Sequence, residues 1–454
     1  MTANDDTLHF DLVVIGGGSG GLAAAFRAAS HGARVALVEP AELGGTCVNV
    51  GCVPKKAMWL AADLVERIAL ARDIGFPLPP CLPHWDELVA HRQRYIANIH
   101  ASYRERLDAA GIVQVVGRAR LCGGGIVETC EGVRLHGRHV LLATGARPHR
   151  PDMPGAELGL VSDDFFAFDA APRRVAIIGG GYIGVELSAI LQALGSHVEV
   201  FVRGPRLLEG FEHEITEQLQ ENYRQRGLGL HLGYTLEALE SVDGGVALRE
   251  RGGDLGNPFD VVLFATGRRA NIAGLGLDAA GVRTDDRGRI VVDRWQDTSA
   301  AGVHAVGDVT DGVALTPVAI AAARRLMDRL FGGDADACLD ASQVPTVVFA
   351  HPPLASVGLT EAQARERFGD DVSCQRTRFR PMLFALAESP QCSLFKLVCT
   401  GPEQRVVGLH LVGEGADEML QGFAVAMRLG ATLADLQATI ALHPTSAEEV
   451  VLMG

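Results

Sequence analysis

Residues 11–21 read DLVVIGGGSGG, and they set the architecture expected for the whole chain. The apolar residues 11–15 predict a buried parallel strand, and the glycines open an Ala-rich helix that runs to about Ser30. A second apolar strand, residues 34–38, ends in Glu39. In such a βαβ unit the glycines let the backbone approach a pyrophosphate at the helix N-terminus, and the acidic residue accepts ribose hydroxyl groups. The unit therefore predicts a dinucleotide site; a glycine-rich turn without a ligand is the less favoured interpretation.

The motif occurs a second time, as VAIIGGGYIG at residues 175–184, followed by a helix and a strand that ends at Val202. No acid stands at the end of this second strand, and Arg203 and Arg206 come next instead. An acid there binds a free ribose hydroxyl, whereas an arginine accommodates a 2′-phosphate. The first unit thus suits FAD and the second suits NADPH. The alternative for the two arginines is a solvated loop.

Two cysteines, Cys47 and Cys52, lie in the segment GGTCVNVGCVPKK, residues 44–56. A bridge between them is possible if the backbone curls back, which Gly51 allows. Pro54 opens an apolar run with helical period, so Cys52 is predicted at a helix N-terminus, where a thiolate is favoured. Two buried cysteines that never pair remain the alternative on spacing alone.

Composition narrows the class of protein. The chain has 454 residues and a formal net charge of -14, which indicates several domains and argues against nucleic acid as a partner. No apolar run has the length of a membrane span, and the beginning, MTANDDTLHF, lacks a cationic segment, so we expect no secretory signal and a cytoplasmic location. There a cysteine pair indicates redox catalysis. The remaining cysteines are interpreted as small buried apolar residues: Cys81, Cys122, Cys130, Cys338, Cys374, Cys392 and Cys399.

The predicted fold class is α/β, with two Rossmann-like dinucleotide-binding domains and a C-terminal α+β domain. From residue 342 the pattern changes to strands of a mixed sheet with interspersed helices. We expect an FAD-binding domain at 1–145, an NAD(P)H-binding domain at 146–268, a central segment completing the FAD site at 269–341, and a further domain at 342–454, to which the resemblance described next assigns dimerisation.

With these motifs in place, the chain resembles the pyridine-nucleotide disulfide oxidoreductases over essentially its whole length, and within them the glutathione reductases. The resemblance is carried by GGTCVNVGCVPKK, by IHASY at 99–103, by LTPVAIAAARR at 315–325 and by the tail HPTSAEE at 443–449. Lys55 stands where lipoamide dehydrogenases and mercuric reductases usually carry a serine. The sequence has no cysteine pair near its C-terminus, as mercuric reductase or the large thioredoxin reductases would have.

This resemblance implies a homodimer that reduces glutathione disulfide with NADPH through FAD and a redox disulfide. Cys47 would form the mixed disulfide with glutathione, and Cys52 would lie beside the flavin. His443 would be the general acid-base, reaching across from the partner subunit, and Glu448 would orient it. The resemblance further implies a pair near the flavin, formed by Lys55 and Glu186.

The resemblance also implies binding residues, and no metal. Tyr182 would cover the nicotinamide pocket and swing aside. The residues expected to contact the two cofactors are Gly16, Gly18, Ser19, Gly20, Gly21, Glu39, Gly45, Thr46, Lys55, Ala119, Thr144, Gly145, Gly179, Gly181, Tyr182, Ile183, Glu186, Arg203, Arg206, Gly267, Arg268, Asp308 and Thr316. Those expected to contact glutathione disulfide are Ser19, Arg27, Tyr103 and Arg324.

Two positions depart from the family pattern. Glu209 stands where glutathione reductases usually carry a second arginine for the 2′-phosphate, and Gly184 stands where NADPH-using members usually have alanine. The hypothesis is therefore an NADPH preference that is less exclusive than usual, with NADH possible. The alternatives are a reductase of a modified glutathione disulfide, a dihydrolipoamide dehydrogenase, and a catalytically silent flavoprotein. The last would be expected to lose its cysteine pair or His443.

Overall fold

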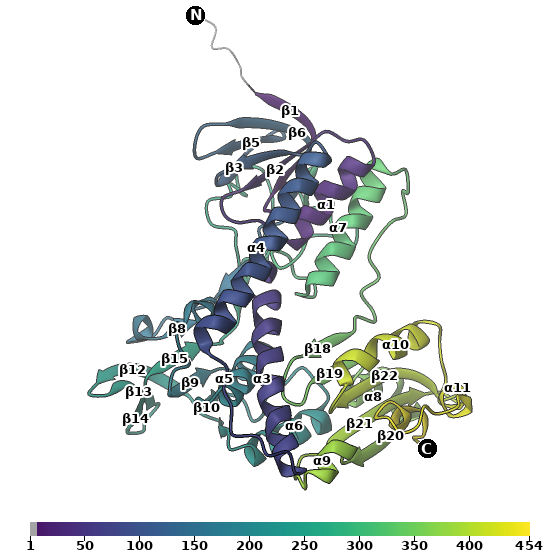
Figure 1. The fold of residues 1–454 in the computed structure, drawn as a ribbon. Helices are drawn as coiled ribbons and strands as arrows, with labels where there is room; N and C mark the ends of the chain where they lie inside the picture. The colour runs from purple at the N-terminus through teal and green to yellow at the C-terminus, as the bar shows by residue number, and fades with distance from the viewer. Residues whose placement is uncertain (1–6) are drawn as a thin grey trace, which may run out of the picture. The chain divides into compact units, whose positions relative to one another are not determined.

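The computed structural model describes residues 7–454, which form two compact units (Figure 1). The first unit comprises the described residues up to Lys55 together with Val89–Pro148 and Arg268–Ala341. The second comprises Lys56–Leu88, His149–Gly267 and Ser342–Gly454. Two long helices, α3 (Cys52–Asp73) and α4 (Trp85–Ala109), pass from one unit into the other.

The first unit is built on a sheet with the order β3-β2-β1-β6-β5-β4, with β17 also paired to β6. Strands β1, β2, β3, β6 and β17 run parallel, whereas β4 and β5 form an antiparallel extension. A short antiparallel pair, β7 with β16, completes the unit. The strands are β1 (Leu8–Ile15), β2 (Val35–Glu39), β3 (Val113–Val116), β4 (Ala119–Gly123), β5 (Ile126–Thr129), β6 (Arg134–Leu142), β7 (Ala146–Pro148), β16 (Arg268–Ala270) and β17 (Val303–Ala305).

Helices α1 (Ser19–Ser30) and α7 (Thr316–Phe331) lie side by side against this sheet (Figure 1). Small residues on α1, such as Ala25, allow the close approach of α7, which contributes Leu326 to the same apolar cluster. The sheet side of this cluster includes Val14, which is fully buried. Because α1 and α7 both start at the carboxyl edge of the parallel strands, their N-termini are brought to one end of the unit.

The second unit contains a parallel sheet of order β11-β10-β9-β15-β8 and an antiparallel sheet of order β18-β19-β22-β21-β20. A three-stranded meander, β12-β13-β14, adjoins the first of these along the chain. The strands of the second unit are β8 (Leu160–Val161), β9 (Arg174–Ile178), β10 (His197–Val202), β11 (Gly229–Leu232), β12 (Leu236–Val242), β13 (Gly245–Glu250), β14 (Leu255–Phe259), β15 (Val261–Phe264), β18 (Thr346–Val348), β19 (Leu354–Gly358), β20 (Val372–Phe379), β21 (Ser393–Thr400) and β22 (Arg405–Val412).

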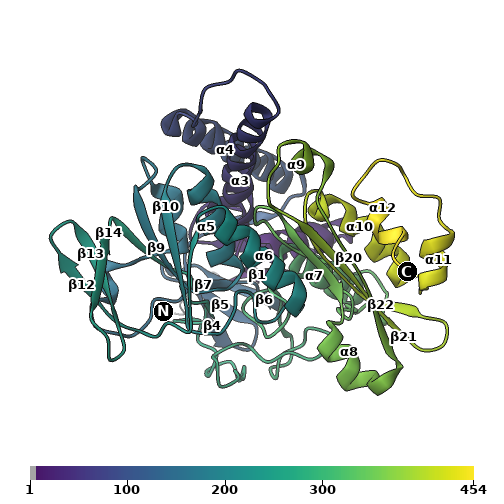
Figure 2. The ribbon, with the colours of Figure 1, turned by 90° about the horizontal axis from the view of Figure 1, so that it is seen from below.

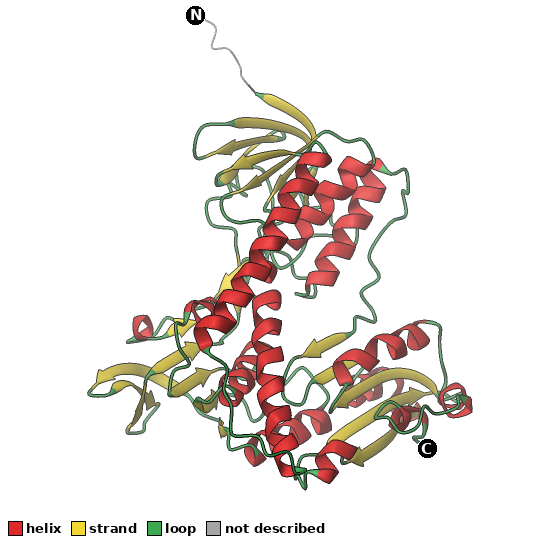
Figure 3. Ribbon diagram, in the orientation of Figure 1, coloured by secondary structure: helices red, strands yellow, loops and turns green. Residues whose placement is uncertain are grey.

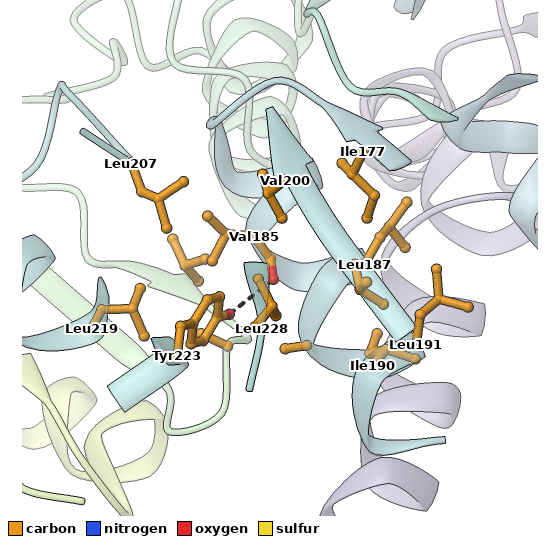
Figure 4. Close-up of a cluster of buried hydrophobic side chains, with 14 of the residues drawn as sticks. Ile177, Val185, Leu187, Ile190, Leu191, Val200, Leu207, Leu219, Tyr223 and Leu228 are labelled. Atoms are coloured by element: carbon orange, nitrogen blue, oxygen red, sulfur yellow. Dashed lines mark hydrogen bonds between the residues drawn. The ribbon is translucent and has the colours of Figure 1, made fainter. Parts of the chain in front are cut away.

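Helices cover both sheets of the second unit. On the parallel sheet, Tyr223 of α6 is buried among leucine side chains and donates a 2.9 Å hydrogen bond to the Val185 carbonyl of α5 (Figure 4). Figure 2 shows α10, α11 and α12 beside the antiparallel sheet. The helices are α5 (Tyr182–Ala193), α6 (His213–Gln225), α8 (Glu361–Phe368), α9 (Met382–Leu386), α10 (Ala416–Arg428), α11 (Leu433–Ala438) and α12 (Glu448–Val451).

Most predicted elements are confirmed within a few residues, as the alternation of helix and strand in Figure 3 illustrates. The meander β12–β14 was not predicted, because its short strands alternate weakly and Pro258 lies inside one of them. The expectation that all seven other cysteines are buried is wrong: Cys399 is buried, Cys338, Cys374 and Cys392 are half-buried, and Cys81, Cys122 and Cys130 are exposed. Within residues 7–454, none of the helices combines the length and apolar character needed to cross a lipid bilayer.

His351 gives the second unit a predicted sensitivity to acid. Its ring is buried and stacks on Trp59 with centroids 5.1 Å apart, and its pKa is lowered well below the usual value by burial and by the charges of Arg226, Lys56 and Arg67. The unfolded chain takes up a proton as the pH falls below about 6.5, but the folded ring does not. The contribution of His351 to the free energy of unfolding is therefore fully present above that pH. Below it, this contribution falls by about 1.4 kcal/mol per pH unit.

We expect His351→Phe, which keeps the stacked ring, to weaken this acid dependence. The measurement is the urea midpoint of unfolding at pH 7.5 and pH 5.5, with His91→Phe on the exposed face of α4 as control. An equal loss of midpoint on acidification in all three proteins would contradict the assignment to His351.

Candidate active site

The first glycine segment forms a cradle at the end of β1. Gly16 has φ 110°, and a Cβ atom on Gly16 or Gly21 would collide with backbone of Ala143 or Gly16, so larger residues do not fit. Helix α1 begins after Gly18 with no side-chain cap among the described residues, which leaves its first N–H groups free to bind an anion. The Glu39 carboxylate accepts hydrogen bonds from the backbone N–H groups of Gly17 at 2.6 Å and Ala41 at 2.9 Å. This fixed carboxylate and the uncapped helix fit the ribose and pyrophosphate of FAD.

The cysteine segment lies directly against this cradle. The Gly44 N–H donates to the Gly17 carbonyl at 2.8 Å, and a Cβ on Gly45 would press on Gly18. Cys47 lies in the short helix α2 (Gly45–Asn49), and Cys52 is the first residue of α3. The predicted helix N-terminus is thus confirmed.

The two sulfur atoms share a polar environment made by three helix N-termini. The Cys52 thiol contacts the Thr316 hydroxyl at 3.8 Å, and Thr316 is the first residue of α7. Cys47 is hydrogen-bonded with Cys52, with Thr316 and with Ser19, the first residue of α1. The structure therefore brings together Ser19, Cys47, Cys52 and Thr316, which are widely separated in the sequence.

These contacts favour the thiolate form of Cys47. The hydrogen bond from Cys52, together with those from Thr316 and Ser19 and the charge of Lys55, lowers the pKa of Cys47 to about 6 against the opposing effect of burial. The pKa of Cys52 is raised, chiefly by its hydrogen bond to Cys47 and by burial. In the reduced pair these contacts therefore favour the thiolate on Cys47 over that on Cys52.

Other predicted FAD contacts surround the same end of the sheet. Arg268 donates to the Thr46 hydroxyl at 3.2 Å and to the Ala146 carbonyl. Burial raises the pKa of Asp308, as expected of a carboxyl group that a ligand hydroxyl would stabilise. The remaining positions are Thr144, Gly145 and Ala119. The Thr144 hydroxyl donates a hydrogen bond to the Asn271 carbonyl at 2.8 Å, and Gly145 has φ 65°. Ala119 is the first residue of β4, two residues after Gly117, whose N–H donates to the Glu39 carbonyl.

The second glycine segment forms an equivalent cradle in the second unit. Gly179 has φ 127° and Gly267 has φ 108°, and α5 begins after Gly181 without a side-chain cap among the described residues. Tyr182 and Ile183 open this helix, and the Tyr182 ring is 46 % exposed. Further along α5, Glu186 is buried and accepts a 2.9 Å hydrogen bond from the Phe349 backbone N–H.

The loop after β10 carries the residues that the sequence predicts to face a 2′-phosphate. Arg203 is exposed, whereas Arg206 donates through Nη2 to the Glu209 carbonyl at 2.7 Å. The Glu209 carboxylate lies against Gly204, between the two arginines in the sequence. Arg203 therefore has the more accessible guanidinium group, and Glu209 places a negative charge on the same loop.

His443 and Glu448 form a pair near the C-terminus. The imidazole Nδ1 lies 2.9 Å from one Glu448 oxygen and 3.2 Å from the other. The hydrogen bond from His443 lowers the pKa of Glu448. The His443 side chain is 79 % exposed in the single chain, so its second ring nitrogen is accessible to another molecule.

A family model described as pyridine nucleotide-disulphide oxidoreductase matches residues 10–323, and the dimerisation domain of the same family matches residues 344–453. The chain belongs to this family. It is 41 % identical over 464 aligned residues to a glutathione reductase of Yarrowia lipolytica, with 98 % of this chain and 99 % of the relative covered. It is 42 % identical to a glutathione reductase of Schizosaccharomyces pombe, with 98 % of both chains covered.

A cavity lies along α1 and α7, and its lining on α1 begins at Ala23, one helical turn after Ser19. Its volume is about 640 Å³, and we call it the basic groove. Two of the predicted substrate residues, Arg27 and Arg324, line the groove. A third, Tyr103, lies near the cysteines: its pKa is raised mainly by burial and, to a smaller extent, by the charge of Cys47. The residues that line the groove include Phe26, Arg27, Arg106, Arg324, Arg325, Asp328 and Asp334.

Sequence reasoning missed Phe26 and Arg106. A helical signal was available for both: Phe26 follows Ser19 by seven residues and Arg106 follows Tyr103 by three, so each pair shares a helix face. The predicted pairing of Lys55 with Glu186 stays a prediction, since the two residues belong to different units.

Proposed function

We propose that this chain reduces glutathione disulfide with NADPH, through FAD and the Cys47–Cys52 couple, as a homodimer. The observation that carries the proposal is the position of Cys47 and Cys52, which lie beside Ser19 and Thr316 at helix N-termini and directly against the first glycine cradle. The family membership and the two glutathione reductase relatives support it. We also propose the four domains expected from the sequence and a cytoplasmic location.

The first glycine cradle and Glu39 would hold FAD, which would supply the transfer of two electrons from NADPH to the Cys47–Cys52 disulfide. The chain's own residues carry out the thiol exchange. The Cys47 thiolate attacks one sulfur of glutathione disulfide, so that a Cys47–glutathione disulfide forms and the substrate S–S bond breaks. The first glutathione leaves as a thiolate and takes a proton from the protonated ring of His443.

The second exchange restores the protein disulfide. Cys52 gives its proton to His443 and attacks the Cys47 sulfur, and the second glutathione leaves and receives that proton. We propose that His443 serves the cysteine pair of the partner subunit and that Glu448 orients its ring. The exposed imidazole and the dimerisation domain at residues 344–453 support this arrangement.

The test compares disulfide and nucleotide substrates in one assay. We expect NADPH oxidation to depend on glutathione disulfide, with no comparable reduction of NAD⁺ by dihydrolipoamide. Turnover of dihydrolipoamide alone would favour the dehydrogenase alternative. A protein that binds FAD but reduces no disulfide would favour the silent flavoprotein.

Glu209→Arg is expected to raise the kcat/KM ratio of NADPH over NADH by about 10-fold, because the change removes a negative charge beside the 2′-phosphate and adds a charge-assisted hydrogen bond. Steady-state kinetics with both nucleotides measure the ratio. Glu221→Arg, the same charge change on exposed α6, is the control. If both variants give the same ratio as the native chain, Glu209 does not face the phosphate; a native ratio below one would overturn the NADPH preference.

A further inference from the structure

The basic groove follows α1 from Ala23 to Ser30 and so begins one helical turn after Ser19. Ser19, which hydrogen-bonds Cys47, shares a helix face with Phe26 and Arg27 in the next two turns. Arg27 lies eight residues from Ser19, or about 12 Å along the helix. The glycine arm of a glutathionyl group extends about 7 Å, since its two α-linked residues, Cys and Gly, span at most about 3.5 Å each. An arginine side chain covers the remaining distance, so a substrate carboxylate falls among the groove arginines.

The charges of the groove suit an anionic substrate. Four arginines line it, against the carboxylates of Asp328 and Asp334. Arg27 is tied to Asp328 at 2.5 Å, and Asp328 is also contacted by His31 at 2.8 Å. The charge of Arg27 is thus already balanced within the protein, which leaves the net positive charge to the other arginines.

Among these, Arg106 is held in place by an aromatic ring. Its guanidinium carbon lies 4.5 Å from the centroid of the Phe26 ring, a cation–π contact. Arg106 is one helical turn after Tyr103 on α4, and the charges of both Cys47 and Arg106 affect the pKa of Tyr103. A guanidinium stacked in this way keeps its N–H groups at its edge, where they can meet a carboxylate in the plane of the group.

We propose that Arg106, positioned by Phe26, is a specificity-determining residue that selects disulfides whose glutathionyl arm carries a free carboxylate. The inference rests on the proposed function and narrows its substrate. It favours unmodified glutathione disulfide over forms in which that carboxylate is neutralised or replaced by a cation, because a neutral arm would leave Arg106 without its partner.

The test pairs variants of the holoenzyme with three disulfides: glutathione disulfide, its bis-glycinamide, and its bis-ester at the γ-glutamyl α-carboxylates. We expect Arg106→Ala to raise KM for glutathione disulfide about 10-fold with little change in kcat, as for loss of uniform binding. With the analogue that lacks the recognised carboxylate, native enzyme and Arg106→Ala should have equal kcat/KM. Arg106→Lys, which keeps the charge but not the planar fork, should recover part of the loss.

Arg94→Ala is the matched control, since Arg94 is an exposed arginine of the same helix that does not line the groove. Phe26→Leu should raise KM about threefold through loss of the stacked ring. The inference is overturned if Arg106→Ala lowers kcat/KM equally for all three disulfides, or no more than Arg94→Ala does. A native enzyme inactive on glutathione disulfide, but with intact bound FAD, would instead overturn the proposed function and this inference with it.

Discussion

Cys47→Ser is expected to lower kcat/KM for glutathione disulfide by on the order of 10⁴-fold or more, because the hydroxyl that replaces the thiolate cannot attack a disulfide at neutral pH. The loss should be confined to thiol exchange. NADPH oxidation with a small quinone as electron acceptor bypasses the cysteines, so this activity should stay within a few fold of the native value. Both rates are measured on protein with the same FAD content.

The two cysteines should also differ in reactivity. In the reduced enzyme the alkylation rate is expected to rise with pH through a midpoint near the Cys47 pKa of about 6, well below that of an ordinary thiol. Cys52→Ala removes the hydrogen bond that contributes most to this low pKa, so the midpoint of this variant should move upward. A midpoint in native enzyme near the ordinary thiol value would contradict the thiolate assigned to Cys47.

His443→Gln is expected to lower kcat with glutathione disulfide by about 10²- to 10⁴-fold, the usual range for loss of a general acid-base. The amide cannot give a proton to the departing glutathione. Glu448→Gln should lower kcat by a smaller factor, because the His443 ring remains and only the hydrogen bond that orients it is weakened. Reduction of the bound flavin by NADPH, followed by its absorbance, should be unchanged in both variants and serves as the control.

Mixed dimers decide whether His443 acts across the interface. If each site combines cysteines of one chain with His443 of the other, a dimer of one Cys47→Ser chain and one His443→Gln chain has one intact site. Random co-assembly makes about half of the dimers mixed, so about a quarter of native activity should return. If each site lies within one chain, no mixture of the two inactive variants regains activity.

Much of the first cradle could be predicted from the sequence because its signals are local. The apolar run before Gly16, the helix after it and the acid at Glu39 are consecutive features, and each depends on the chain's own geometry. Cys52 at a helix start could be found in the same way, from Pro54 and the period of the apolar residues that follow. The roles of Cys47 and His443, in contrast, came from resemblance, since a lone cysteine or histidine carries no local signal of catalysis.

Residues far apart in the chain could not be brought together by local patterns. Thr316 meets Cys52 because α7 starts at the same sheet edge as α1, and no spacing in the sequence encodes this contact. The burial of His351 under Trp59 has the same character. The order of the strands within each sheet and the exposure of Cys122 also depend on packing between distant segments.

The sequence by itself determined two dinucleotide-binding units, a cysteine pair at a helix N-terminus and the absence of an acid at Val202. Only the tertiary structure decided which hydroxyls and charges surround the sulfurs, and that Arg106 stacks on Phe26 at the basic groove. The physical reason is that periodicity along a chain specifies which face of an element is buried, whereas the partner of that face depends on how all the elements pack together.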